Sequence, residues 1–234
     1  MRHEALALME QAVRTRYGFD AVIGIDEAGR GALAGPVYAG ACAVTDARNT
    51  AFINDSKVLS RRQRDQAFEL LPGHALVAVG YASAAQIDAC GILQATYQAM
   101  EMAFQDLLPR VREHWGSSAC IGVVVDGSLL PPFLATQQVT ALAIVDADAL
   151  LLSVAAASIA AKVTRDRTML DLSRRVRGYG FESNVGYGTR EHISAIRGRG
   201  LSAEHRHSFV IRELATIEEL PFAARPQQGT RQHR

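Results

Sequence analysis

Cysteines are few in this sequence, and no apolar stretch is long. The three cysteines are widely spaced and form no CxxC pair, which argues against a structural zinc site and favours a reducing compartment. We expect all three to be small buried side chains. The longest apolar stretch, residues 141–161, is interrupted by two aspartates and a serine, whereas a membrane span needs about 20 apolar residues. The sequence therefore predicts a cytoplasmic protein without a membrane span.

Signals of targeting and repetition are also missing. Residues 1–20 carry acidic and polar side chains where a signal peptide has an uninterrupted apolar core, so we expect an amphipathic helix there. With 19 glycines, 7 prolines and no repeated period, the sequence excludes collagen-like, low-complexity and solenoid architectures. The 234 residues, 48% hydrophobic and 21% charged, have the composition of a globular protein with a large core.

Charge is unevenly distributed along the chain. The formal net charge is +1, but residues 1–159 contain 11 basic and 16 acidic side chains, whereas residues 160–234 contain 14 basic and 8 acidic ones. This asymmetry suits a protein that holds cations with one part and a polyanion with the other. An uneven surface without function explains the same counts, so charge alone does not decide.

Apolar runs and helical periodicity alternate along the chain and predict a mixed α/β fold. The first three predicted strands suggest a meander, and helices separate the later ones. Strands are predicted over residues 21–25, 37–44, 75–81, 121–125 and 139–144. Helices are predicted from a cap at Ser60, over 92–108 before Pro109, over 149–176, from a cap at Thr189 to 198–200, and over 211–220. No linker separates two domains, and we expect disorder over residues 226–234.

Acidic residues stand at equivalent places of three predicted elements. Asp26 and Glu27 follow one apolar strand, Asp126 follows another, and Asp148 precedes the long alanine-rich helix. A turn, a helix cap or solvent exposure explains each of them singly. Together they repel one another unless cations neutralise them, and oxygen ligands suit Mg²⁺ or Mn²⁺. A carboxylate cluster that holds two such cations is the equipment of phosphodiester hydrolysis.

Three other patterns have competing explanations. The glycines of residues 29–35 look like a dinucleotide loop, but Pro36 and a strand follow where that loop needs a helix, so we expect close backbone approach to a ligand such as a sugar hydroxyl. Ser158 and Lys162 are one residue too far apart for an SxxK nucleophile, and Ser158 is interpreted as helix packing. Histidines near the C-terminus lack the partners of a metal site and are interpreted as phosphate contacts or surface residues. These are His192, His205 and His207.

Six blocks, in order between residues 22 and 209, closely resemble the type 2 ribonuclease H family, ribonuclease HII. The blocks are GIDEAGRGALAGPVYAGA, NDSKVLS, VVDGSLLP, SVAAASIAAKVTRD, GYGTREH and HRHSF. The resemblance implies an α/β, RNase H-like fold, with a mixed five-stranded sheet flanked by helices and a helical C-terminal part. It also implies that divalent metal ions, Mg²⁺ or Mn²⁺ and two of them with substrate bound, are held by Asp26, Glu27, Asp126 and Asp148.

The same resemblance implies endonucleolytic hydrolysis of the RNA strand of RNA–DNA hybrids. It includes cutting at a single ribonucleotide embedded in duplex DNA, which leaves 3′-hydroxyl and 5′-phosphate ends. Gly29, Arg30 and Gly31 would contact the ribose 2′-hydroxyl, and Tyr187 would sense the same ribose. Other side chains would bind backbone phosphates without reading bases, so that binding weakens as salt rises. This substrate-binding set contains Ser56, Lys57, Arg61, Arg62, Lys162, Arg165 and Arg190.

The sequence departs from the family pattern in three places. Asp146 stands where lysine is common and is an alternative ligand to Asp148, but the spacing to SVAAASI favours Asp148. Ala32 and Val210-Ile211 stand where prolines are frequent. Neither of these changes removes a ligand.

The expected organisation is an N-terminal helix, 1–20, a catalytic domain, 21–210, and a short helix with a disordered tail, 211–234. We expect a monomer that binds RNA–DNA hybrid or ribonucleotide-containing DNA duplex, with Leu220-Pro221-Phe222 as a candidate segment for contact with a replication clamp. Two other functions stay open. A non-catalytic nucleic-acid-binding module leaves the carboxylates without purpose, and a metal-dependent phosphatase of small molecules leaves the basic C-terminal third without purpose.

Overall fold

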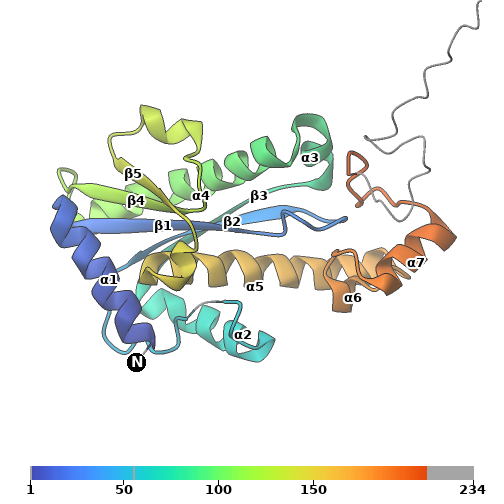
Figure 1. The fold of residues 1–234 in the computed structure, drawn as a ribbon, viewed down its shortest axis with the longest axis horizontal. Helices are drawn as coiled ribbons and strands as arrows, with labels where there is room; N and C mark the ends of the chain where they lie inside the picture. The colour runs from blue at the N-terminus through green and yellow to red at the C-terminus, as the bar shows by residue number, and fades with distance from the viewer. Residues whose placement is uncertain (1, 55, 210–234) are drawn as a thin grey trace, which may run out of the picture.

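A mixed sheet of five strands forms the centre of the molecule (Figure 1). The computed structural model describes residues 2–54 and 56–209. In the order β3-β2-β1-β4-β5, the first three strands are antiparallel neighbours, and β4 and β5 run parallel to β1. The strands are β1 (Ala21–Ala28), β2 (Val37–Val44), β3 (Ala75–Ala82), β4 (Ile121–Asp126) and β5 (Thr140–Ile144). The predicted meander and the predicted mixed five-stranded sheet are confirmed.

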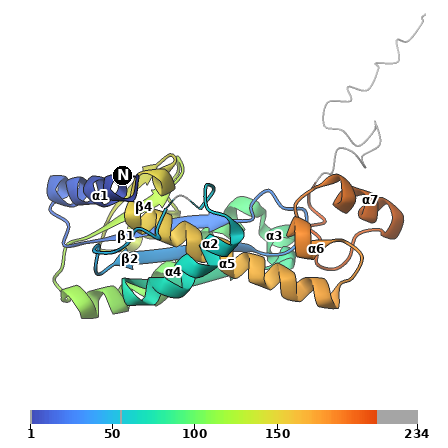
Figure 2. The same cartoon turned by 90° about the horizontal axis from the view of Figure 1, so that it is seen from below.

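Helices cover both faces of the sheet (Figures 1 and 2). α4 packs on one face, and α5 packs on the other with α1 and α2 beside it. α6 and α7 lie beyond the sheet at the C-terminal end of α5 and form the predicted helical C-terminal part (Figure 1). The helices are α1 (Arg2–Tyr17), α2 (Arg61–Leu70), α3 (Ala84–Cys90), α4 (Ile92–Trp115), α5 (Leu152–Arg175), α6 (Phe181–Asn184) and α7 (Arg190–Arg199). Three short 3₁₀ helices cover Leu71–Gly73, Pro132–Thr136 and Ala147–Ala149.

The alanine-rich helix α5 lies close against the sheet because the contacting side chains are small. A Cβ atom on Gly24 would lie 2.3 Å from backbone atoms of Ser153 and Val154, and one on Gly40 would lie 2.2 Å from the carbonyl oxygen of Ala157. Glycines in two strands therefore allow the backbones of helix and sheet to approach each other. This approach positions the N-terminal half of α5 beside the C-terminal end of β1.

The first turn of α5 is capped from α1. The N-cap residue of α5, Leu151, makes no side-chain hydrogen bond to this turn. The buried carboxylate of Glu10 accepts the backbone N–H of Ser153 at 2.6 Å instead. The predicted N-terminal helix thus fixes the start of the helix that packs beneath the sheet.

The end of helix α4 was predicted wrongly. The helix passes through Pro109, where we expected it to stop, and continues to Trp115. Proline removes the hydrogen bond to the carbonyl of Gln105, but both residues are exposed, so water can bond to that oxygen. The buried face of the helix meanwhile continues to Val111, which favours an unbroken helix.

Two further expectations need correction. Strand β1 does not end before Asp26 and Glu27, because both residues pair with β2. Cys42 is buried as expected, whereas Cys90 and Cys120 are exposed. The predicted helix over 211–220 and the predicted tail lie outside the described residues. Within residues 2–54 and 56–209, no helix combines the length and apolarity needed to cross a membrane.

Candidate active site

Two parallel strands bring acidic side chains to one end of the sheet. β1 and β4 are neighbours, with Ile25 paired to Val125, so Asp26 and Asp126 follow at the same level. Glu27 comes next on β1, and because side chains alternate along a strand it leaves the opposite face of the sheet from Asp26. All three acids line one hollow of about 370 Å³. We call it the carboxylate hollow.

Asp148 lies in the 3₁₀ helix Ala147–Ala149, ahead of α5. The backbone N–H of Ala147 donates to Oδ1 of Asp126 at 2.7 Å, which ties this segment to the end of β4. The side chain of Asp148 is 1% exposed, and its Oδ2 lies 2.9 Å from Nζ of Lys57. The alternative acid, Asp146, is exposed and has a left-handed backbone with φ 56°. The structure therefore places Asp148, and not Asp146, inside the protein beside Asp126.

Burial and mutual repulsion raise the pKa of three of these acids. The pKa of Asp26 lies well above its usual value because the side chain is buried and Glu27 repels a second charge, which a hydrogen bond from Ser158 offsets in part. Burial raises the pKa of Glu27 although Arg30 forms a 3.0 Å ion pair with it. Burial likewise raises the pKa of Asp126. The ionised cluster is therefore unfavourable by itself, and a bound cation would relieve it.

The donor set fits a hard divalent cation. Within residues 2–54 and 56–209, no backbone or hydroxyl donor reaches either carboxylate oxygen of the buried Asp148. Carboxylate oxygens are the ligands that Mg²⁺ and Mn²⁺ prefer. Among the described residues, no three His, Cys, Asp or Glu side chains already stand close enough to coordinate one ion. Glu27 and Asp148 are each held by a basic side chain instead. A cation that binds here competes with these ion pairs.

Basic and hydroxyl side chains border the carboxylate hollow. Lys57, Lys162 and Arg64 line it together with Ser56. The Oγ of Ser56 lies 2.9 Å from the Oγ of Ser158, the same residue that bonds Asp26, so Ser158 does more than the helix packing expected of it. Arg64, which sequence reasoning missed, donates to the carbonyl oxygen of Ser56 at 2.8 Å. This bond steadies the segment that carries Lys57.

The loop of residues 29–35 after β1, which we call the glycine loop, lies over a buried arginine. Gly29 has φ 93°, and a Cβ atom on it would lie 1.9 Å from Nε of Arg165. Arg165 is 0% exposed and donates to the carbonyl oxygens of Ala34 and Pro36, so it supports the loop from inside the protein. At Gly31, by contrast, no atom of the described residues other than Gly31 and its two chain neighbours lies within 4 Å of the Cβ position. Space for a ligand therefore remains above Gly31.

Arg206 holds the same loop and was missed by sequence reasoning. Its side chain is buried, and its guanidinium donates to the carbonyl oxygens of Gly29 and Arg30 at 2.8 Å and of Gly35 at 3.0 Å. The HRHSF block contains this residue, but nothing in the block tells which atoms it contacts. The C-terminal segment thus fixes the backbone of the glycine loop.

Tyr187 reaches the carboxylate hollow from the loop between α6 and α7. Its ring lies against the guanidinium of Arg165, 5.2 Å away, and the ammonium of Lys162, 5.8 Å away. The preceding residue, Gly186, accepts the backbone N–H of Leu33 from the glycine loop at 2.8 Å. The structure therefore brings together the two segments that were expected to contact a ribose.

Several predicted binding residues lie elsewhere. Arg61 and Arg62 begin α2 and Arg190 begins α7, and all three are exposed side chains that do not line the carboxylate hollow. The interpretation of His192 and His205 as phosphate contacts or surface residues is wrong, because both are 0% exposed. The residues next to His192 and His205 in the sequence give little sign of this burial, because the side chains that cover the two histidines come from separate elements.

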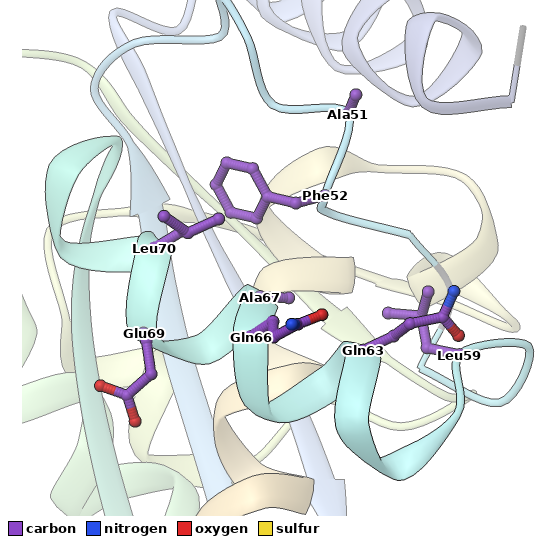
Figure 3. A pocket seen from close by; sticks show the side chains of 8 residues that line it. All are labelled: Ala51, Phe52, Leu59, Gln63, Gln66, Ala67, Glu69 and Leu70. Atoms are coloured by element: carbon purple, nitrogen blue, oxygen red, sulfur yellow. The ribbon is translucent and has the colours of Figure 1, made fainter.

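A second hollow, beside α2, is mainly apolar and carries no comparable chemistry (Figure 3). It measures about 510 Å³ and is lined by Ala51, Phe52, Leu59, Gln63, Gln66, Ala67, Glu69 and Leu70. Its single acid, Glu69, forms a 2.6 Å ion pair with Arg167. The chemistry therefore belongs to the carboxylate hollow.

A mixed five-stranded sheet that gathers carboxylates at the ends of two parallel strands defines a nuclease of the ribonuclease H type. The chain belongs to the ribonuclease HII family, whose model matches residues 23–212. Ribonuclease HII of Desulfitobacterium hafniense is 44% identical over 209 residues, covering 89% of this chain and 75% of that protein. Ribonuclease HII of Cereibacter sphaeroides is 42% identical over 207 residues, covering 88% and 89%.

Solved structures agree on the fold. Ribonuclease H2 from Pyrococcus horikoshii superposes with a TM-score of 0.57 at 25% identity, covering 81% of this chain and 93% of that one. The chain from the PCNA:RNase HII complex of Archaeoglobus fulgidus gives a TM-score of 0.64 at 22% identity, covering 86% and 100%. Bst-RNase HIII in complex with Mn²⁺ gives a TM-score of 0.55 at 22% identity, covering 77% of this chain and 63% of that one. Membership of the ribonuclease HII family, rather than this likeness of fold, identifies the protein as a nuclease that hydrolyses the RNA strand of RNA–DNA hybrids.

Proposed function

We propose that this protein cuts at single ribonucleotides embedded in duplex DNA, as well as within RNA–DNA hybrids, with the help of two divalent cations. The products carry 3′-hydroxyl and 5′-phosphate ends. The observation that carries the proposal is the shared hollow, in which three carboxylates border the glycine loop and Tyr187. A site that joins phosphodiester chemistry to a contact for one sugar suits a substrate with one 2′-hydroxyl.

Asp26, Glu27, Asp126 and Asp148 are the proposed metal ligands, for Mg²⁺ or Mn²⁺. Their buried, mutually repelling oxygens fit such ions. When bound, the cations supply activation of water and stabilisation of charge on the leaving oxygen. The Mn²⁺ complex of Bst-RNase HIII, which shares the fold, is in keeping with this assignment.

The remaining residues hold the substrate. Lys57 and Lys162 bring positive charge to the edge of the carboxylate hollow, where a scissile phosphate would lie. Gly31 leaves its backbone open to a ribose, and the fixed backbone of Gly29 and Arg30 presents the loop to the 2′-hydroxyl. The ring of Tyr187, 36% exposed, lies at the same hollow and completes the sugar contact.

Cleavage of labelled duplexes tests the proposal. The substrates are a DNA duplex with one ribonucleotide, a long RNA–DNA hybrid and an all-DNA duplex, each with Mg²⁺, Mn²⁺ or chelator. We expect metal-dependent cutting at the ribonucleotide, no cutting of all-DNA duplex, and loss of activity in Asp126→Asn. Binding without cutting would instead support a nucleic-acid-binding module, and hydrolysis of a nucleotide monoester alone would support a phosphatase.

Assembly and location complete the proposal. We propose a cytoplasmic monomer whose catalytic unit spans residues 21–210. The neighbouring fold from Archaeoglobus fulgidus was solved with PCNA, and we propose a replication clamp as a partner here, contacted through Leu220-Pro221-Phe222. This segment lies outside the described residues. Binding of purified clamp that persists after deletion of the segment would rule out this contact.

A further inference from the structure

Two buried histidines face each other behind the carboxylate hollow. His192 on α7 and His205 in the following loop are each 0% exposed, and their Nε2 atoms lie 3.1 Å apart. Neither residue lines the carboxylate hollow. A pair of buried imidazoles is costly unless each nitrogen has a complementary partner, so their hydrogen bonds indicate what the pair does.

The neighbours of the pair fix the position of each ring proton. The backbone N–H of Ser202 donates to Nδ1 of His205 at 2.9 Å, so this nitrogen accepts and the proton of a neutral ring lies on Nε2. Nδ1 of His192 lies 2.8 Å from the carbonyl oxygen of Tyr187 and must donate to it. Nε2 of His192 then accepts from Nε2 of His205. The Ser202 hydroxyl, 2.8 Å from Nδ1 of His205, donates to the same nitrogen. One arrangement of two neutral rings satisfies all four hydrogen bonds.

The surroundings keep both rings neutral. The aromatic rings of Tyr179 and Phe181 pack against them, with centroids 4.7 Å from His205 and 5.4 Å from His192 respectively. Tyr179 and His207 are the titratable neighbours that face the pair among the described residues, and the Tyr179 hydroxyl is engaged with the carbonyl oxygen of Gly200. Burial lowers the pKa of both histidines, that of His205 to about 4. A second proton on either ring would place N–H against N–H.

The chain of hydrogen bonds ends at Tyr187. Its carbonyl oxygen accepts from His192 and also from the backbone N–H of Thr189 at 2.8 Å, and its own N–H donates to the carbonyl oxygen of Asn184 at 2.9 Å. The backbone of Tyr187 is thus held on both sides, which limits where the half-exposed ring can lie. The histidine pair supplies the one bond to this backbone that comes from a side chain in the described structure.

We propose that His192 and His205 are positioning residues for Tyr187, and that their paired neutral rings set the selectivity for a ribonucleotide without touching the substrate. This inference rests on the proposed sugar-contacting role of Tyr187. A rotation of the His192 ring breaks its hydrogen bond to the Tyr187 carbonyl. A rotation of the His205 ring removes the donor to Nε2 of His192, which fixes the His192 ring.

The hydrogen bonds that lead from His205 through His192 to the Tyr187 carbonyl are called the relay. Matched substitutions at position 192 test whether the relay positions Tyr187. His192→Phe keeps an aromatic ring among Tyr179 and Phe181 but donates no hydrogen bond, whereas the amide nitrogen of His192→Asn replaces Nδ1 as the donor to Tyr187. We expect His192→Phe to lower kcat at a single ribonucleotide by about 10- to 100-fold with an unchanged KM, and His192→Asn to recover most of this loss. Equal activity of the Phe variant and wild type, or no recovery in the Asn variant, would overturn the relay.

Ring ¹⁵N NMR of the wild-type protein provides a readout that does not depend on activity. We expect a proton on Nδ1 of His192 and on Nε2 of His205, and we expect both rings to titrate below the usual histidine pKa. The opposite tautomers, or titration near the usual histidine pKa, would overturn the relay even if the proposed function holds. A fully active and selective Tyr187→Ala enzyme would instead remove the sugar-contacting role, and the relay with it, while leaving the nuclease activity intact.

Discussion

Nζ of Lys57 lies 2.9 Å from Oδ2 of Asp148. The two side chains differ sharply in environment, since the lysine is 66% exposed and the aspartate 1% exposed. The lysine therefore covers a buried charge while its own ammonium borders the carboxylate hollow, where a substrate phosphate would arrive. The pair links the acidic interior to the surface that binds a polyanion.

Replacing Lys57 by Met keeps the length of the side chain and removes its charge. We expect KM for duplex substrate to rise about tenfold, and the slope of log affinity against log salt concentration to fall by about one, because one phosphate contact is lost. Binding measured at several salt concentrations checks this. Arg48→Met is the control, because Arg48 is an exposed cation that follows the far end of β2 and should leave the slope unchanged. An unaltered slope in Lys57→Met would contradict the phosphate contact.

Two isosteric changes distinguish the effect of charge repulsion at Asp126 from the effect of the ion pair between Asp148 and Lys57. Asp126→Asn keeps an oxygen for the N–H of Ala147 and removes one negative charge, so we expect metal-free stability to rise. Asp148→Asn breaks the ion pair between Lys57 and a buried side chain, so we expect the metal-free stability of this variant to fall. Both variants should lose cleavage by at least about 100-fold. Denaturant unfolding with and without Mg²⁺ measures the two effects, and parallel shifts in both variants would refute this account.

The glycine loop offers a matched pair for testing sugar contact. Gly31→Ala fills open space, so stability should change by less than about 0.5 kcal/mol while cleavage at a single ribonucleotide falls about tenfold. Gly29→Ala combines a positive φ with an overlap on the hydrogen-bonded Arg165 and should cost more than about 1 kcal/mol in stability. Thermal unfolding and cleavage assays together decide the matter. Full activity of Gly31→Ala would show that no ligand approaches this residue.

Acid should destabilise the protein through His205. Burial lowers its pKa from 6.5 to about 4, so between pH 7 and pH 5 the unfolded chain takes up a proton that the folded protein does not. The contribution of neutral His205 to folding stability is present above the ordinary histidine pKa and is lost as the pH falls below that pKa. We expect the stability advantage of wild type over His205→Phe to shrink by about 2 kcal/mol over this range.

Local pattern was sufficient for most of the fold. The strand predicted over 37–44 matches β2, and Ser60 and Thr189 cap α2 and α7 as expected, because an apolar run or a capping side chain acts within a few residues. Pro109 was misjudged because the effect of a proline depends on which face of the helix it occupies, and that face is set by tertiary packing. The continuation of β1 through Asp26 depends on its partner strand in the same way.

In the site, too, local pattern predicts some residues, whereas tertiary contacts determine the others. The acids at the ends of β1 and β4 follow from an apolar run that meets a carboxylate, together with parallel pairing of the two strands. The supporting groups do not, because Arg206 bonds a loop at the other end of the chain and His192 contacts His205 only after α7 has folded. Contacts of this kind have no periodicity or motif of their own. The family resemblance located the block that contains Arg206 without indicating its contacts.

Arg206 is joined to the glycine loop across 171 to 177 residues of sequence. On the ribosome this makes the loop one of the last parts to be completed. At about 5–20 residues per second, several seconds separate synthesis of Asp148 from synthesis of Arg206. A nascent chain therefore contains every proposed metal ligand before it contains the arginine that holds the backbone meant to recognise a ribose.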